Sequence, residues 1–359
     1  MRERPVTRSR SKSPSGKSTR SEKGADSATS SRSRSKSPSS KKKKKKEKPQ
    51  LGSFFIWDGT WLGSTWAPSQ ASLRHRQQRD LKNNIFDMAS FALFFVGAAC
   101  SKPVEVAPSI SGLRMTVLVV NAIVAYLMRL SGNNVMPPVD KKTNPVIFDI
   151  LNPIGSSAFL TYQSTTLFAL YATIKAGAEL TLSLLPYVFL EGSAAAAIAS
   201  DFLLRVVALL CWMSPFFQGL AVVLTLLWLK FNWFETEWQE TVIKFWSDLG
   251  FTSVAAVQWF GHATMPLAFV DIFLCRSYSR KEMTSLVMPQ PTLVLFVAAY
   301  SVIYMGNTLW LATINGGHYP YPFLTKICEK WWTISVFTGG ITTIVTTICV
   351  SLRLLSIAH

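Results

Sequence analysis

Few residues of the kinds that build metal and redox sites occur in this sequence. Its 359 residues include 5 cysteines and 4 histidines. The cysteines lie in or beside apolar stretches and none stands in CxxC spacing, which argues against a zinc site and against a disulfide framework. Acidic residues are also scarce, at 20 against 37 Lys and Arg. We therefore predict no metal site and no cofactor for this chain.

Positive charge dominates the N-terminal region, where no apolar stretch follows Met1. No secretory signal peptide is predicted, and the first membrane segment is expected to direct insertion. Residues 1–50 contain 18 Lys and Arg against 4 Asp and Glu, which gives them +14 of the net charge of +17. They include RSRSKSPS twice and the unbroken block Lys41–Lys46. Such a segment buries too little apolar area to fold, so we predict a disordered tail.

Three roles for this tail are open. It is a solvated cytosolic segment that orients the chain, or it binds anionic lipid headgroups through Lys41–Lys46, or it faces RNA or the nuclear envelope as an Arg/Ser segment. Each basic residue near an anionic surface contributes about 1 kcal/mol. We favour the cytosolic tail, keep the lipid contact as the second interpretation, and expect no nucleic-acid partner.

The rest of the chain is apolar and predicts an all-α, polytopic bundle of transmembrane helices. We divide the chain into the tail at 1–50, an aromatic interfacial segment with a short helix at 51–112, and a six-helix transmembrane domain at 113–359. A further stretch, Ile85–Cys100, reaches only about 24 Å and is either an additional tilted span or a re-entrant helix. Six stretches are long enough to span a bilayer: Leu113–Leu130, Pro153–Lys175, Asp201–Lys230, Phe251–Cys275, Thr292–Thr313 and Trp331–Leu355.

The distribution of basic residues orients these spans, because cytoplasmic loops of membrane proteins are enriched in Lys and Arg. With six crossings and a cytosolic tail, Arg276, Arg280 and Lys281 also lie in the cytosol. A crossing at Ile85–Cys100 would move them to the other side. The charge rule therefore favours six crossings, in a multi-pass protein of the endoplasmic reticulum or the plasma membrane.

His262 is the one histidine placed inside an apolar run, and an ionisable side chain at membrane depth is costly unless it has a use. The alternative is a structural role, as a neutral imidazole that hydrogen-bonds between helices. Polar side chains in other spans are candidate partners: Asn121, Ser157, Thr161, Ser164, Thr165, Asp271, Tyr300, Tyr304 and Asn307.

Thr161 lies on a hydroxyl-bearing face of its predicted helix, at a depth that differs from that of His262 by about 5 Å. A hydroxyl and a neutral imidazole at matched depth can act as nucleophile and general base. The same face also suits helix packing, since Ser and Thr in membrane helices bond back to backbone carbonyls. Asp271 is about 13 Å along the helix from His262, so no carboxylate completes a triad.

Three blocks, in order, resemble the androgen-induced and androgen-dependent TFPI-regulating family of membrane threonine hydrolases. The resemblance covers roughly Leu113 to Leu355 and leaves residues 1–112 outside it. The blocks are Phe159-Leu160-Thr161 at the start of a span, His262-Ala-Thr-Met-Pro266 followed by Asp271, and Leu309-Trp310 followed by Tyr319-Pro-Tyr-Pro-Phe-Leu324.

This resemblance implies an intramembrane hydrolase of six helices that cleaves fatty acid esters of hydroxy fatty acids. It further implies Thr161 as the nucleophile and His262 as the base, with a lipid ester and the bilayer as partners. The alternative is a non-enzymatic membrane protein, a scaffold or transporter-like bundle with a lipid- or RNA-binding tail. A transporter is expected to show inverted repeats or charged residues at the midplane, and neither is recognised in the sequence.

Overall fold

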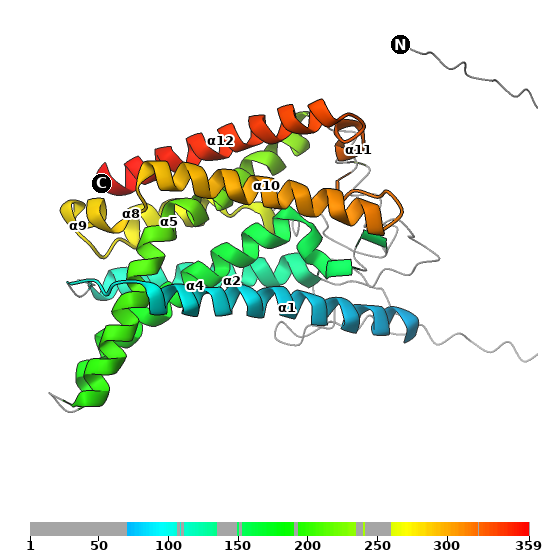
Figure 1. Ribbon diagram of the computed structural model, residues 1–359. Helices are drawn as coiled ribbons and strands as arrows, with labels where there is room; N and C mark the ends of the chain where they lie inside the picture. Colours follow the sequence, from blue (N-terminus) through cyan, green and yellow to red (C-terminus); the bar gives the residue numbers. More distant parts are fainter. Residues whose placement is uncertain are drawn as a thin grey trace, which may run out of the picture. The chain divides into compact units, whose positions relative to one another are not determined.

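The computed structural model describes residues 70–105, 108, 111–134, 149–150, 153–189, 193–234, 240, 260–321 and 323–358 (Figure 1). Every regular element in this part of the chain is a helix, which confirms the all-α prediction. The predicted tail, with its block Lys41–Lys46, lies outside the described residues. In chain order the elements are α1 (Gln70–Cys100), α2 (Gly112–Asn134), η1 (Gly155–Ala158), α4 (Leu160–Val188), α5 (Ala194–Phe234), α8 (Met265–Leu274), α9 (Arg280–Leu286), α10 (Gln290–Ile314), α11 (Phe323–Ile327) and α12 (Trp331–Ala358).

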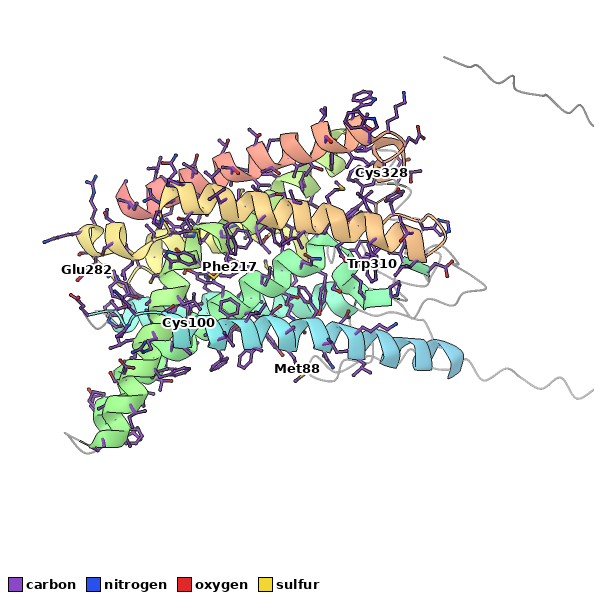
Figure 2. The ribbon with its side chains drawn as sticks, in the orientation of Figure 1. Met88, Cys100, Phe217, Glu282, Trp310 and Cys328 are labelled. Carbon is purple, nitrogen blue, oxygen red and sulfur yellow. The ribbon has the colours of Figure 1, made fainter. Side chains whose placement is uncertain are left out.

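Six of the described helices are long and apolar enough to cross a membrane: α1, α2, α4, α5, α10 and α12. Their outward faces carry large apolar side chains, such as Met88 on α1, which is 73% exposed, and Trp310 on α10 (Figure 2). A surface of this kind suits hydrocarbon rather than water, and the helices satisfy their backbone polar groups internally. The chain is therefore a multi-pass membrane protein, as the apolar runs predict.

The central helix is α4, which packs most extensively against α2 and α5. Phe168 and Tyr171 of α4 and Phe217 of α5 are almost fully buried, and Phe217 is seen among the helices in Figure 2. The rings of Tyr171 and Phe217 stack with centroids 5.3 Å apart. Such an aromatic pair contributes about 0.5–1.5 kcal/mol beyond the area that it buries. This packing fixes α4 against α5, the two helices that carry most of the candidate site.

Two contacts mark the opposite ends of the bundle. At one end, the side-chain oxygen of Asn83 on α1 accepts from the backbone amide of Ser156 at 2.8 Å. At the other end, the guanidinium of Arg114, at the start of α2, donates to the carbonyl of Arg276 at 3.1 Å. We call these the Ser156 end and the Arg276 end.

The stretch Ile85–Cys100 belongs to a spanning helix rather than to a re-entrant one. The apolar part of α1 begins earlier than predicted and covers Leu81–Cys100, a run of 20 residues. Because α1 runs from the Ser156 end to the Arg276 end, it adds a crossing (Figure 1). Arg276 and Arg280 therefore lie at the end opposite to the start of α1. The charge rule, which favoured a path without this crossing, put them at the same end as the start of α1.

The predicted continuous span Phe251–Cys275 is interrupted near its middle. Residues 260–262 are helical, residues 263–264 are not, and α8 begins at Met265, while residues 251–259 lie outside the described part of the chain. Pro266 explains the new start, because proline lacks a backbone N–H and is tolerated in the first turn of a helix. With 10 residues, α8 reaches only about 15 Å, half the thickness of a bilayer core.

Candidate functional site

Thr161 and His262 lie side by side, although 101 residues separate them in the sequence. The Oγ1 atom of Thr161 is 3.5 Å from Nε2 of His262, in a part-buried setting. Thr161 stands in the first turn of α4, and His262 ends the helical turn that precedes α8. The distance is long for a hydrogen bond, and such contacts in unliganded sites often tighten when substrate binds. The structure thus brings together two residues that we predicted as neighbours from their similar depth in the membrane.

The backbone at His262 is held by Thr225 of α5. The hydroxyl of Thr225 donates to the carbonyl oxygen of His262 at 2.6 Å and accepts from the backbone amide of Met265 at 3.0 Å. The hydroxyl of Thr264 donates to the carbonyl of Ala221 at 2.7 Å. The hydroxyl of Thr225 thus satisfies the amide of Met265 after the interruption and gives the carbonyl of His262 a donor besides the amide of Thr264. These bonds position the imidazole by fixing the backbone that carries it.

Trp228, about one turn after Thr225 on α5, stacks on the imidazole of His262. The ring centroids are 5.5 Å apart and the planes differ by 20°. Because Trp228 is buried, this contact restricts rotation of the imidazole and excludes water from one of its faces. Sequence analysis missed both Thr225 and Trp228, since each sits in a long apolar run with no spacing that distinguishes it.

The start of α4 presents backbone amides close to Thr161. No side chain caps this helix, and the amide of Gln163 is bonded to the carbonyl of Phe159. Tyr321 approaches from the segment before α11, with its ring packed edge-on against Phe159 at 5.7 Å. Burial raises the pKa of the Tyr321 phenol, and donor groups of Thr161 and Leu160 oppose that rise. The N-terminus of α4 therefore faces the phenol oxygen of Tyr321. The positive end of the helix dipole favours negative charge at this position.

The other candidate partners of His262 make contacts elsewhere. Asn121 donates to a backbone carbonyl of α8 at 3.3 Å, and Tyr300 donates to the side-chain oxygen of Gln163 at 3.0 Å. The hydroxyl of Thr165 bonds back to the carbonyl of Thr161 at 2.8 Å. A hydrogen bond from a side-chain hydroxyl to a carbonyl of its own helix is the structural role that we gave as the alternative for this face. Thr161 is the member of that face whose hydroxyl meets the imidazole.

Asp271 belongs to a second polar cluster inside the bundle. Its carboxylate accepts from the ammonium of Lys175 at 2.7 Å, from the hydroxyl of Tyr171 at 2.6 Å and from the amide of Gln218 at 2.7 Å. All four side chains are buried. Lys175 was predicted to end its span, but α4 continues past it to Val188. Sequence analysis recognised no charged residues at the midplane, and it did not recognise that Lys175 and Asp271 form a buried charged pair inside the bundle.

Glu179, one turn beyond Lys175, extends this cluster toward the Arg276 end. It is fully buried and accepts from the hydroxyl of Ser277 at 2.7 Å. Beside it lies a cavity of about 20 Å³, enough for a water molecule. Within the described part of the chain, the cavity is lined by buried polar atoms without a hydrogen-bond partner: Oε1 of Glu179, Oε1 of Gln218, Nη1 of Arg276, Oη of Tyr278 and Oγ of Ser356.

These features define an integral membrane protein of the polytopic helix-bundle class, with a Thr–His pair near one end and a buried charged cluster nearer the other. Among the described residues, no group of three or more His, Cys, Asp or Glu side chains is arranged to hold a metal ion. Comparison of the chain with known proteins found no matching family model, no matching curated protein and no matching solved structure. Its function is therefore argued from the contacts described above.

Proposed function

We propose that this chain is an integral membrane hydrolase of lipid esters, with Thr161 as the nucleophile and His262 as the general base. The observation that carries the proposal is the 3.5 Å contact between Thr161 Oγ1 and His262 Nε2. A threonine hydroxyl is a weak nucleophile until a base takes its proton, and imidazole is the side chain best suited to that task near neutral pH. The resemblance to membrane threonine hydrolases supports the assignment and implies fatty acid esters of hydroxy fatty acids as substrates.

The reaction follows from the placement of the two side chains. His262 Nε2 takes the proton from Thr161 Oγ1 while that oxygen attacks the ester carbonyl carbon, which gives a tetrahedral oxyanion. The N-terminus of α4 supplies backbone amides and the positive end of a helix dipole to stabilise this charge. The intermediate then expels the alcohol, which receives the proton from His262, and the acyl group stays on Thr161. A water molecule deprotonated by His262 attacks this ester, releases the acid and restores the threonine.

The bilayer is the source of the substrate in this proposal. We also propose that the protein resides in the endoplasmic reticulum or plasma membrane with its tail in the cytosol. Its block Lys41–Lys46 is then available to anionic lipid headgroups, which attract polybasic segments.

A fluorophosphonate probe, which reacts with activated hydroxyl groups, tests the proposal on the purified full chain. The expected adduct is on Thr161, and Thr161→Ala abolishes both the adduct and ester hydrolysis, whereas Thr161→Ser retains some of each. His262→Ala lowers turnover by about 10²–10⁴-fold, the usual contribution of a general base. Thr165→Ala is the matched control, because that hydroxyl lies one turn away and bonds to its own helix.

An adduct at another residue, or unchanged hydrolysis by Thr161→Ala, would show that the pair is structural. The rival function is a transporter-like bundle, and the buried pair Lys175–Asp271 is the observation that favours it. Charged residues inside a membrane domain often mark ion pathways. Ion flux into vesicles that depends on Asp271, without ester hydrolysis, would decide for the rival.

A further inference from the structure

Glu179 is a buried acidic side chain that the proposed reaction does not use. It is fully buried, and it lies eighteen residues after Thr161 on α4, which is about 27 Å at 1.5 Å per residue. An inference about Glu179 is therefore independent of the proposed hydrolase function, and the failure of one leaves the other intact.

The two oxygen atoms of the Glu179 carboxyl group have different surroundings. Oε2 accepts from the hydroxyl of Ser277 at 2.7 Å, whereas Oε1 is buried and has no hydrogen-bond partner among the described residues. A buried carboxylate oxygen without a donor carries the full cost of desolvation. A proton on Oε1 removes the negative charge and turns this oxygen into a donor. The contacts therefore favour the carboxylic acid over the carboxylate.

Lys175, one turn before Glu179, has its counter-charge in Asp271. The ammonium of Lys175 donates to Oδ1 of Asp271 at 2.7 Å, and Oδ2 of Asp271 accepts from Tyr171 and Gln218. Both oxygens of Asp271 thus have donors, and the two charges of the pair balance each other. A second carboxylate beside this pair adds a negative charge inside the bundle, which is costly at membrane depth.

Arg276 is the cation that lines the cavity beside Glu179 together with Lys175. Burial and the neighbouring guanidinium groups of Arg114 and Arg280 lower the pKa of Arg276. Its side chain is partly exposed, and water screens an exposed charge, so it compensates a buried carboxylate only weakly.

The other titratable or charged groups come from each element packed around Glu179. Thiols and phenols among them are uncharged near neutral pH, and the side chains of Glu282 and Arg353 bond to backbone groups. These groups are Tyr171 of α4, Cys211 of α5, Cys275 and Tyr278 after α8, Glu282 of α9 and Arg353 of α12.

The cavity of about 20 Å³ beside Glu179 brings together polar atoms from several segments. Oε1 of Gln218 is an acceptor, and the hydroxyl groups of Tyr278 and Ser356 are able to donate or accept. These three side chains are 3%, 5% and 4% exposed. A water molecule donates two hydrogen bonds and accepts two, which matches this mixture of donors and acceptors.

We propose that Glu179 is a proton-binding site, which holds a proton on Oε1 at neutral pH and exchanges it through one water molecule in this cavity. During release, the bond between Oε1 and the proton breaks as the water oxygen takes that proton. The water passes one of its own protons toward the Arg276 end, and Glu179 is left as a carboxylate. A proton that returns by the same route restores the acid. Oε1 of Gln218 orients the water by accepting one of its hydrogen atoms.

A sodium ion is the other ligand that oxygen atoms of these kinds accept. Nη1 of Arg276 lines the same cavity, and a guanidinium group repels a cation. A proton on Oε1 adds no charge beyond that of the neutral acid, so it avoids this repulsion. The arrangement therefore favours a proton over a sodium ion.

Infrared spectroscopy of the full chain in dodecyl maltoside, a detergent without a carbonyl group, tests this site. The protein should show a carboxylic acid band at neutral pH that moves to lower frequency in heavy water. Glu179→Gln, which has the shape of the neutral acid, should fold and lose this band, and Glu179→Asp should restore a band at an altered frequency. Glu282→Gln is the matched control and should keep the band, because glutamine also serves in the capping box at the start of α9 (Figure 2).

Two leucine substitutions on α12 test the role of the water. Ser356 lines the cavity, and Ser351 is an exposed serine on the same helix. Ser356→Leu should fill the cavity and slow the exchange of the acid proton for deuterium by about tenfold, the factor for the loss of one hydrogen bond. Ser351→Leu should exchange as the parent protein does.

A band that persists in Glu179→Gln, or the lack of an acid band in the parent protein at neutral pH, would overturn the proposal. So would loss of the band on addition of sodium chloride but not of choline chloride, because the site would then bind a metal cation. Equal exchange rates for the two leucine variants would overturn the water-mediated route. No substrate is needed, so Thr161→Ala should give the spectrum of the parent protein whether or not the chain hydrolyses esters.

Discussion

Removal of the Asp271 carboxylate tests whether the charged cluster is desolvated as the contacts indicate. Asp271→Ala leaves the ammonium of Lys175 without the oxygen that it meets at 2.7 Å, and leaves the donors of Tyr171 and Gln218 without an acceptor. The side chains of Lys175 and Asp271 are 9% and 2% exposed, so bulk water does not replace the lost partner. Removing one member of a buried ion pair costs about 3–5 kcal/mol.

The assay is thermal unfolding in detergent, followed by intrinsic tryptophan fluorescence. At roughly 2–4 °C per kcal/mol, Asp271→Ala should lower the unfolding temperature by about 10 °C. The matched control is Asp201→Ala, which breaks the exposed pair between Asp201 and Arg205 on α5, whose charged atoms are 2.8 Å apart. Exposed helix pairs contribute about 0.3–0.5 kcal/mol, so the control should shift by less than about 2 °C.

A double variant separates the charges from the packing. Lys175→Met combined with Asp271→Leu removes both charges and should recover part of the lost stability, because an apolar replacement of a buried ion pair is often neutral. If Asp271→Ala unfolds within about 2 °C of the Asp201→Ala control, the reasoning that these charges are desolvated is refuted.

Three further predictions concern the His262 segment, the path of α1 and the tail. Thr225→Val should lower ester turnover at least about tenfold, because the His262 carbonyl and the Met265 amide lose a partner, whereas Thr225→Ser should retain activity; equal activity of the two variants would contradict this. Cysteines placed at Ser72 and Thr284 should react with a membrane-impermeant maleimide from opposite sides, and labelling from one side would mean that α1 does not cross. Deletion of residues 2–48 should leave insertion and hydrolysis intact while weakening binding to anionic vesicles, and loss of folding would contradict a separate tail.

The sequence predicted the helices and one pair of neighbours because both depend on properties that run along the chain. Hydropathy locates spans, since a bilayer requires a long apolar run. Depth within a span follows from counting residues from its end, and this count placed Thr161 level with His262. The described parts of the two segments, from Leu160 and from residue 260, run in the same direction from the Ser156 end, which agrees with the count. The catalytic role assigned to the pair remains a prediction.

Contacts between helices were beyond such counting, because they depend on how each helix is rotated. Lys175 and Asp271 are 96 residues apart, and a lone lysine in a hydropathy plot marks the end of a span rather than half of an ion pair. Asn83 was likewise excluded from the apolar stretch of α1. Its pairing with Ser156, 73 residues away, offsets the cost of burying its amide. The apolar stretch therefore looked too short for a certain span, and the sequence left its crossing open.

The break at residues 263–264 has a consequence for how the chain assembles in the membrane. A continuous helix enters hydrocarbon with its backbone groups already paired, and each unpaired group costs several kcal/mol there. The amide of Met265 finds its partner in Thr225, 40 residues earlier in the chain, and the carbonyl of His262, which accepts from the amide of Thr264 at 2.9 Å, gains a second donor there. The amide of Met265 is therefore satisfied in the bilayer once α5 stands beside the segment. We therefore expect the segment to insert and to dock on α5 in a single step. This step places the imidazole next to Thr161 and against Trp228 of α5.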